Sequence, residues 1–151
     1  MRALLLGFVL AATSAPVVFG QTPCSRGTAD GYACDQVTLM AHLDFEELGV
    51  PATPRGNDIW GWTDPETGRE YALVGTWDGV SYVDLTTPTA PRLVGVLPSA
   101  APLADRGNNW RDIKTRGFFA FIVSEALDHG MQVVDLRRLR AITGAPVTFS
   151  A

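Results

Sequence analysis

Short apolar runs alternate along this chain with turns rich in Gly, Pro and Asp, a pattern that predicts short β-strands. Two stretches share one pattern, residues 71–85 and residues 119–136. Each has an aromatic and apolar strand, a turn that ends in Gly, and a second apolar strand that closes on Val-Asp-Leu. A strand-rich unit that recurs after roughly 50 residues is typical of a propeller or a similar repeat array.

The first unit is predicted to span residues 57–97 and to hold four strands. Asp64 to Gly68 and the pair Asp78-Gly79 are strong turn signals, because Pro, Asp and Gly fit turn conformations that other residues resist. Four short strands in about 40 residues make one propeller blade. The expected strands are residues 58–62, 70–75, 80–85 and 92–97.

The second unit is predicted over residues 109–151. A helical turn is expected at residues 137–140, and residues 146–151 read as the start of a fourth strand. The fold class is therefore all-β, with about two four-stranded blades of an incomplete ring. Because propellers close with four to eight blades, we expect the sequence to be a fragment of a longer protein, with assembly as the alternative. The first three strands are predicted at residues 110–115, 118–124 and 130–136.

Residues 1–20 have the pattern of a secretory signal peptide. Met1-Arg2 is basic, residues 3–12 are apolar but too short to span a bilayer, and cleavage is predicted before Gln21. The alternative is an uncleaved anchor or a buried helix. The expected location is secreted, extracellular or on the cell surface. No other apolar run is long enough for a transmembrane span in the mature chain.

Residues 21–56 form an N-terminal extension before the repeats. Its two cysteines, Cys24 and Cys34, are the only ones in the chain and are expected to form a disulfide in an oxidising compartment. A zinc site is the alternative, but two thiols without a nearby His pair are too few ligands. Val37, Met40 and Leu43 have helical spacing, so a short helix is predicted after Asp35. His42 is interpreted as a partly exposed structural residue.

Composition and charge restrict the classes of partner. The chain of 151 residues is 46% hydrophobic and has a formal net charge of −4. This supports a folded core rather than a disordered chain. Lys and Arg are scattered without a basic stripe, so no nucleic-acid partner is predicted.

Several motifs together resemble the choice-of-anchor B family, whose blades are similar to LVIVD repeats. They are residues 57–75, 109–114, 120–126 and 129–136, and the segment around Cys24 and Cys34 is similar as well. The resemblance covers about residues 24–150 and implies a secreted or surface-displayed β-propeller protein. It also implies a membrane or cell-wall anchor in a C-terminal region outside these residues. The later His- and Asp-rich blades of that family have no counterpart here.

One group of side chains has metal-binding chemistry. Asp112, Glu125, Asp128 and His129 could hold a divalent cation such as calcium, which favours oxygen ligands. The alternative is that Asp128 and His129 shape the turn before Gly130. One imidazole with scattered acids does not reach the ligand pattern of a defined metal site.

The remaining acidic, serine and tryptophan candidates also have structural interpretations. Asp84 and Asp135 end equivalent strands and are expected to cap turns rather than to form a catalytic pair. Ser81, Ser99 and Ser124 lack the nucleophile-elbow pattern, and no glycine-rich phosphate loop occurs. Four tryptophans either form a carbohydrate platform or pack between blades, with packing expected: Trp60, Trp62, Trp77 and Trp110.

Three functions follow as hypotheses. The first is an extracellular binding or display module with an unknown ligand or protein partner, and with no catalytic residue or cofactor. The second is a metal-dependent hydrolase or lyase on a complete propeller, with its ligands mostly in other blades. The third is an extracellular structural interaction protein that pairs through exposed blade edges.

Overall fold

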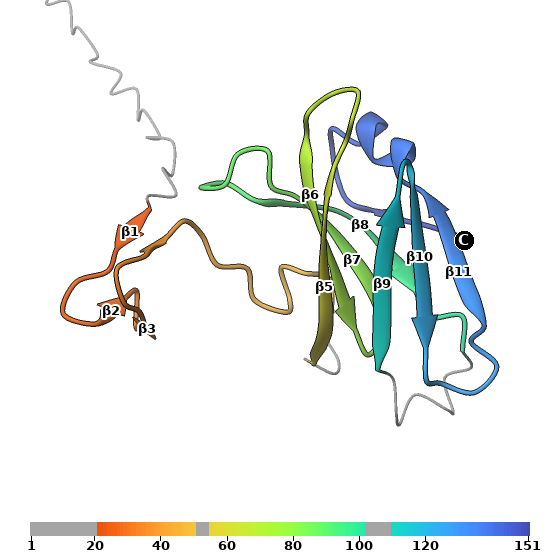
Figure 1. Cartoon of the computed structure of the whole chain (residues 1–151), viewed down its shortest axis with the longest axis horizontal. Coiled ribbons are helices and arrows are strands. Elements are labelled where there is room, and N and C mark those ends of the chain that lie inside the picture. Colours follow the sequence, from red (N-terminus) through yellow and green to blue (C-terminus); the bar gives the residue numbers. More distant parts are fainter. Residues whose placement is uncertain (1–20, 51–54, 102–109) are drawn as a thin grey trace, which may run out of the picture.

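The computed structural model describes residues 21–50, 55–101 and 110–151. The predicted signal peptide, its cleavage site and the linker prolines Pro51 and Pro54 lie outside the described residues. The described chain is mostly β and forms several small sheets, which confirms the all-β class. Figure 1 shows two larger sheets side by side and a smaller N-terminal part at their left.

The first sheet contains the four strands predicted for the first unit, in sequence order and antiparallel. Its central pair is buried at nearly every position, as the continuous apolar runs predict. Gly79 begins the third of these strands, where a Cβ atom would lie 1.9 Å from the carbonyl oxygen of Leu97, so only glycine fits. The strands are β5 (Gly56–Thr63), β6 (Glu70–Thr76), β7 (Gly79–Asp84) and β8 (Arg92–Pro98).

The second sheet contains three antiparallel strands in the order β11-β10-β9, again where the sequence predicts them. The predicted helical turn follows as the 3-10 helix η2 (Leu136–Ala141), capped by the Asp135 carboxylate, which accepts a hydrogen bond from the Arg137 backbone N–H. The strands are β9 (Arg111–Arg116), β10 (Phe119–Ser124) and β11 (Met131–Asp135).

The two sheets pack face to face and share one hydrophobic core. The first sheet contributes Leu73 and Tyr82, and the second contributes Ile113 and Ile122, all of them fully buried. Leu139 of η2 closes one end of this core. Strand β5 contacts β9, so the first strands of both units lie next to each other (Figure 1).

The fourth strand expected in the second unit has a different partner. Strand β12 (Val147–Thr148) pairs in parallel with β8 of the first sheet, Val147 opposite Gly95. The expectation that it completes the second sheet is therefore wrong. Phe149, which follows, is buried and packs its edge on the Tyr82 ring at 5.2 Å between centroids. A Cβ on Gly95 would lie 2.6 Å from the Val147 carbonyl oxygen, so this glycine makes room for β12.

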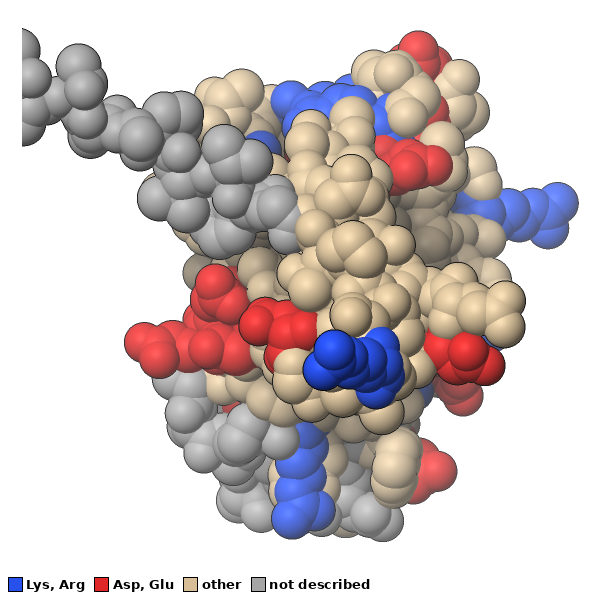
Figure 2. All heavy atoms as spheres, turned by 90° about the vertical axis from the view of Figure 1, so that its left-hand side faces the viewer, with Lys and Arg blue, Asp and Glu red and all other residues tan. Residues whose placement is uncertain are grey.

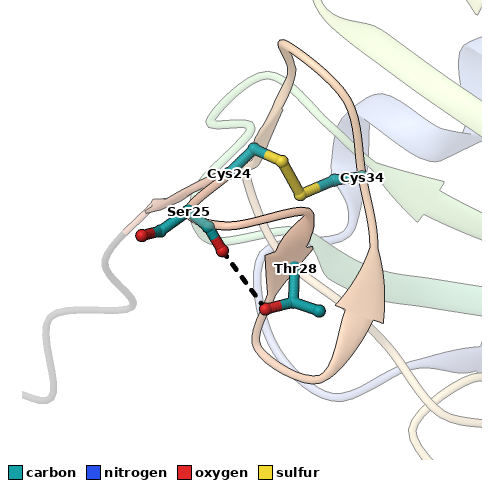
Figure 3. Close-up of a disulfide and its surroundings, with 4 residues drawn as sticks. All are labelled: Cys24, Ser25, Thr28 and Cys34. Carbon is teal, nitrogen blue, oxygen red and sulfur yellow. Dashed lines mark hydrogen bonds between the residues drawn. A yellow bond between two sulfur atoms is a disulfide. The ribbon is translucent and has the colours of Figure 1, made fainter.

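The N-terminal extension contains the predicted disulfide between Cys24 and Cys34 (Figure 3). Next to it, the Thr28 hydroxyl donates a hydrogen bond to the Ser25 carbonyl at 3.3 Å. Two pairs of very short strands surround the bridge: β1 (Thr22–Pro23) with β4 (Thr38–Leu39), and β2 (Thr28–Ala29) with β3 (Tyr32–Ala33).

The helix predicted after Asp35 is wrong. Gln36 has a φ of 54°, outside the right-handed helical region, and Val37 accepts a hydrogen bond from the Cys24 backbone N–H at 3.2 Å. The disulfide and the pairing of β1 with β4 hold this segment extended. The apolar residues of this segment do have helical spacing, but the disulfide and the strand pairing determine its extended conformation.

Residues 44–50 cover the face of the first sheet that points away from the second sheet. The Ser81 hydroxyl donates a hydrogen bond to the Leu48 carbonyl at 2.7 Å, and Val50 is buried. A Cβ on Gly49 would lie 3.1 Å from Val96 Cγ1 of β8, so the segment lies close against this face. In the view of Figure 2, which looks from this side, acidic and basic side chains are interspersed among uncharged ones.

Replacing Gly95 with Ala tests the placement of β12. We expect the added methyl group to displace residues 147–149 and to lower the free energy of unfolding by about 1–3 kcal/mol, the usual cost of overpacking. Urea unfolding measures the loss. Gly144→Ala is the matched control, since a Cβ there meets no atom within 4 Å. An equal effect of both substitutions would contradict the pairing of β12 with β8.

Candidate functional site

Polar side chains gather where the two sheets meet, and we term this contact the seam. At one end of the seam, Asp58 of β5 accepts a hydrogen bond from the backbone N–H of Ile113 in β9, at 2.7 Å from Oδ2. Its other oxygen accepts the N–H of Ile59 at 2.8 Å. A carboxylate is thus shared between the first strands of both units, although these strands belong to different sheets.

Two of the four tryptophans lie in the seam. Trp60 Nε1 donates to the Thr115 hydroxyl at 3.0 Å, and Trp62 Nε1 donates to the Gly117 carbonyl at 2.9 Å. The Trp62 ring stacks on Tyr71 in the core. Trp62 is buried, which confirms the packing interpretation for this residue, whereas Trp60 stays exposed beside its hydrogen bond. Trp110, at the start of the second unit, is exposed.

An ion pair joins the two units at the opposite end of the seam. Arg140 of η2 donates two hydrogen bonds at 2.6 Å to the carboxylate of Asp64, which is fully buried in the turn between β5 and β6. The same guanidinium reaches Glu66 at 2.7 Å. Hydrogen bonding from Arg140 outweighs the effect of burial and holds the pKa of Asp64 well below its usual value.

Asp84 and Asp135 cap the turns that follow equivalent strands, as predicted. Each accepts the backbone N–H of the residue two positions later at 3.0 Å, from Thr86 and from Arg137. Burial opposes ionisation of Asp84, but hydrogen bonds from Thr86 and Arg69 outweigh it and lower its pKa. For Asp135, the hydrogen bond from Arg137 is the main cause of a lowered pKa. Both carboxylates therefore stabilise the backbone of the turn that follows their strand.

His129, a candidate metal ligand, is buried and engaged in the seam. Its Nε2 lies 2.9 Å from Arg111 Nη1, and its Nδ1 lies 3.0 Å from the Gly130 carbonyl oxygen. A guanidinium only donates hydrogen bonds, so Nε2 must accept and Nδ1 must carry the proton. Neither nitrogen is left to bind a cation in this arrangement.

The neighbouring candidates shape the turn. Asp128 has a φ of 60°, a left-handed conformation that Asp tolerates, and it lies on the surface before Gly130. The Glu125 backbone N–H donates to the Trp110 carbonyl at 3.0 Å. Among the described residues, no three His, Cys, Asp or Glu side chains gather as a metal site. The geometry favours the turn interpretation over calcium binding at Glu125, Asp128 and His129.

Arg111 is a central residue that sequence reasoning missed. It begins β9, is 4% exposed, and donates from Nε to the Thr76 carbonyl at 2.7 Å and from Nη2 to the Trp77 carbonyl at 3.1 Å. The second unit is thereby hydrogen-bonded to the turn between β6 and β7. The only sequence signal is a cation at the start of an apolar strand, which does not identify its partners.

A surface pocket of about 460 Å³ lies between the N-terminal extension and the connection from β7 to β8. His42 lines it and packs against the Tyr32 ring at 5.0 Å between centroids, which fits the structural role predicted for this residue. Asp30 and Glu47 give the lining an acidic character, and Met40 and Pro91 add apolar surface.

Comparisons of this chain with protein-family models, with curated proteins and with solved structures find no match. Within the described residues, no helix has the length and apolar character to cross a membrane. The resemblance to the choice-of-anchor B family therefore stays a prediction.

The ion pair at Asp64 predicts a loss of stability in acid. The folded-state pKa is lowered, so the carboxylate stabilises the fold above its ordinary pKa of about 4, and this contribution falls as the pH drops below that value. Asp64→Asn should lower stability at pH 7 and flatten the pH dependence of the unfolding free energy below about pH 5. Asp35→Asn, at an exposed carboxylate, is the control and should leave the profile unchanged. Matching profiles for both variants would contradict this role of Arg140.

His129→Ala tests the contact with Arg111. The substitution removes the hydrogen bond between His129 Nε2 and the buried Arg111 guanidinium, and we expect a loss of about 1–3 kcal/mol in the free energy of unfolding. His42→Ala removes the other, exposed histidine and should change stability by less than about 0.5 kcal/mol. Chemical denaturation with tryptophan fluorescence measures both. Equal stability of wild type and His129→Ala would show that the contact contributes nothing.

Proposed function

We propose that this chain is an exported binding or display module of the extracellular space or cell surface, built on propeller-type blades and without catalytic activity. The two units contribute equivalent sheets that pack with their first strands side by side, as neighbouring blades do. The resemblance of residues 57–75 and 109–136 to the choice-of-anchor B family points in the same direction.

One observation carries the proposal: the side chains between the sheets that have catalytic chemistry are engaged in structural contacts. Asp58 binds a backbone N–H of the other sheet, Asp64 is paired with Arg140, and His129 accepts from Arg111. A catalytic acid, base or nucleophile must instead lie within reach of a substrate. These groups hold the two units together and leave the protein's surface for binding.

The disulfide supports the exported location. Disulfides persist in oxidising compartments and are rare in the cytosol. The bridge between Cys24 and Cys34 closes a small loop directly after the predicted cleavage site at Gln21. On the chain-entropy model, a loop of this size stabilises by about 2–3 kcal/mol.

A second function, an extracellular structural interaction protein, is favoured by one surface. The second sheet exposes four large apolar side chains on the face that points away from the first sheet: Phe119, Val123, Met131 and Val133. Contiguous exposed apolar residues of this kind mark interaction sites in soluble proteins. The two functions are compatible, since a display module can bind its partner through such a face.

Expression from Met1 in a host with a secretory pathway tests the proposal. We expect a product outside the cytoplasm whose mass corresponds to a chain that begins at Gln21 with the disulfide formed. The control is Leu6→Arg, which interrupts the apolar run of the signal peptide and should keep the protein inside. A substrate panel for hydrolases and lyases, measured with and without calcium, should show no turnover, and a glycan array tests carbohydrate as the ligand.

Two results would overturn the proposed function. One is an uncleaved product that stays in the cytoplasm while Leu6→Arg behaves in the same way. The other is turnover that a chelator abolishes and that Glu125→Gln reduces, which would establish the metal-dependent hydrolase or lyase instead.

A further inference from the structure

The exposed face of the second sheet has a defined composition, and we term it the outer face. Strand register places its side chains in three rows that cross β9, β10 and β11, because alternate residues point to the same side of a sheet. Its centre is apolar and its β9 edge carries two cations and one carboxylate. The rows are Arg116, Phe119 and Asp135; Lys114, Phe121 and Val133; and Asp112, Val123 and Met131.

The outer face corresponds, position by position, to the face with which the first sheet packs on the second. Tyr71 pairs with Asp84 in the first sheet, and Phe119 pairs with Asp135 at the same place in the second. Trp62 and Arg116 are likewise the partners of Tyr71 and Phe119 on the first strand of each unit. On β6 and β7, the residues of the first sheet at these positions are buried in the core, including Tyr71, Leu73, Val80 and Tyr82.

The two equivalent faces, the packed face of the first sheet and the outer face of the second, differ in solvent exposure. Tyr71 is 1% exposed and Tyr82 is 0% exposed, whereas their counterparts Phe119 and Val133 are 40% and 39% exposed. The sequence thus supplies an interface of the same type twice, and among the described residues a sheet packs on the first one only. An apolar sheet face of this kind is stable when another layer covers it.

Asp112 indicates which hydrogen-bonding group a sheet packed on the outer face must present. Its counterpart Asp58 accepts the first-strand N–H of Ile113 in the next sheet. The Asp112 side chain is 76% exposed, with Lys114 Nζ at 3.8 Å from Oδ1. A sheet packed on the outer face in the same relation would place a first-strand N–H opposite this carboxylate.

Lys114 and Arg116 stand where the first sheet has Trp60 and Trp62. Both tryptophans donate hydrogen bonds to oxygen atoms of the second sheet, at Thr115 and Gly117. Lys and Arg also donate, with longer reach and a positive charge. The covering sheet is therefore expected to present oxygen acceptors, carboxylates among them, along its first strand.

A second copy of this chain does not fit this position through its first sheet. In the seam, the second sheet packs on the first with the face that holds Ile113, Ile122 and Val134. The corresponding face of the first sheet carries residues 44–50 over β7 and β8, held by the hydrogen bond from Ser81 to Leu48, and leaves Ile59 of β5 exposed. A copy would have to remove its own cover first, whereas a further unit like residues 109–151 brings an uncovered face.

We propose that the outer face is the docking surface for a further antiparallel sheet of the same repeat, whose first strand lies beside β9 and donates a backbone N–H to Asp112. This inference rests on the propeller-type module proposed above. It adds three points to that proposal: the partner of the outer face, the orientation of this partner with its first strand beside β9, and the polar contacts that Asp112, Lys114 and Arg116 make with it.

A lengthened chain tests the proposal: the full sequence, a Gly/Ser linker long enough to reach from β12 to the outer face, and a second copy of residues 109–151. We expect the added unit to dock and to unfold in one cooperative transition with the rest. In hydrogen exchange, the added amide that corresponds to Ile113 should be protected. Asp112→Ala should reduce that protection roughly tenfold or more, since hydrogen bonds to charged groups are among the stronger ones. Asp112→Asn keeps an acceptor oxygen and should retain part of the protection.

The 151-residue chain supplies the controls. Without a docked unit, Asp112→Ala should leave its urea midpoint unchanged, while Asp58→Ala should lower it. Phe121→Glu should abolish docking in the lengthened chain and leave the circular dichroism of the 151-residue chain unchanged. These variants separate a loss of docking from a loss of folding.

Two outcomes would overturn the proposal. In one, the added unit stays unprotected, or Asp112→Ala has the same effect in both chains. In the other, sedimentation shows that the 151-residue chain self-associates and that Phe121→Glu dissociates it, which would assign the outer face to a second copy. Turnover or failed export would contradict the proposed function but would leave these docking measurements unaffected.

Discussion

The first sheet must be covered on both faces, and the rest of the fold is arranged around this constraint. Strands β6 and β7 are buried at nearly every position and have no polar side to turn to water. The second sheet covers one face, residues 44–50 cover the other, and β12 pairs along the edge strand β8. The first sheet is thus the middle layer, and the order of layers follows from its composition.

Polar residues determine how the second sheet lies on the first. Apolar contact alone is non-directional, so it does not select one rotation or offset between two flat surfaces. Asp58, Arg111 and Arg140 bind specific groups of the other unit at separate places along the seam. Breaking any one of these pairs leaves a polar group without its partner, which penalises other arrangements of the sheets.

The sequence was sufficient to predict what depends on local pattern. Strands β5 to β11, the turn at Gly79 and the disulfide follow from alternation, turn chemistry and the cysteine count. The expected helix around Val37 and Met40 was wrong, because apolar spacing carries no information on the cross-links that hold this segment extended. The partner of β12 was wrong for a related reason: a two-residue strand pairs where space exists, and Gly95 provides it.

The candidate site was less predictable than the fold. The turn-capping role of Asp84 and Asp135 is local and was predicted correctly. The contact between Arg111 and His129, and the ion pair between Arg140 and Asp64, join residues far apart in the chain. Residue type shows that such groups need partners, but only the packing of the two sheets shows which partners they have.

The parallel pairing of β12 with β8 has a consequence for synthesis on the ribosome. Hairpin contacts within β5 to β8 are local and can form early, but β12 comes from residues 147–148, after the entire second sheet. The packing contact between the Tyr82 ring and Phe149 also forms only after the second sheet has been synthesised. Of the two larger sheets, the one that emerges first is therefore the last to be completed. Until then its β8 edge is open to pairing with other chains, a period in which a chaperone would protect it.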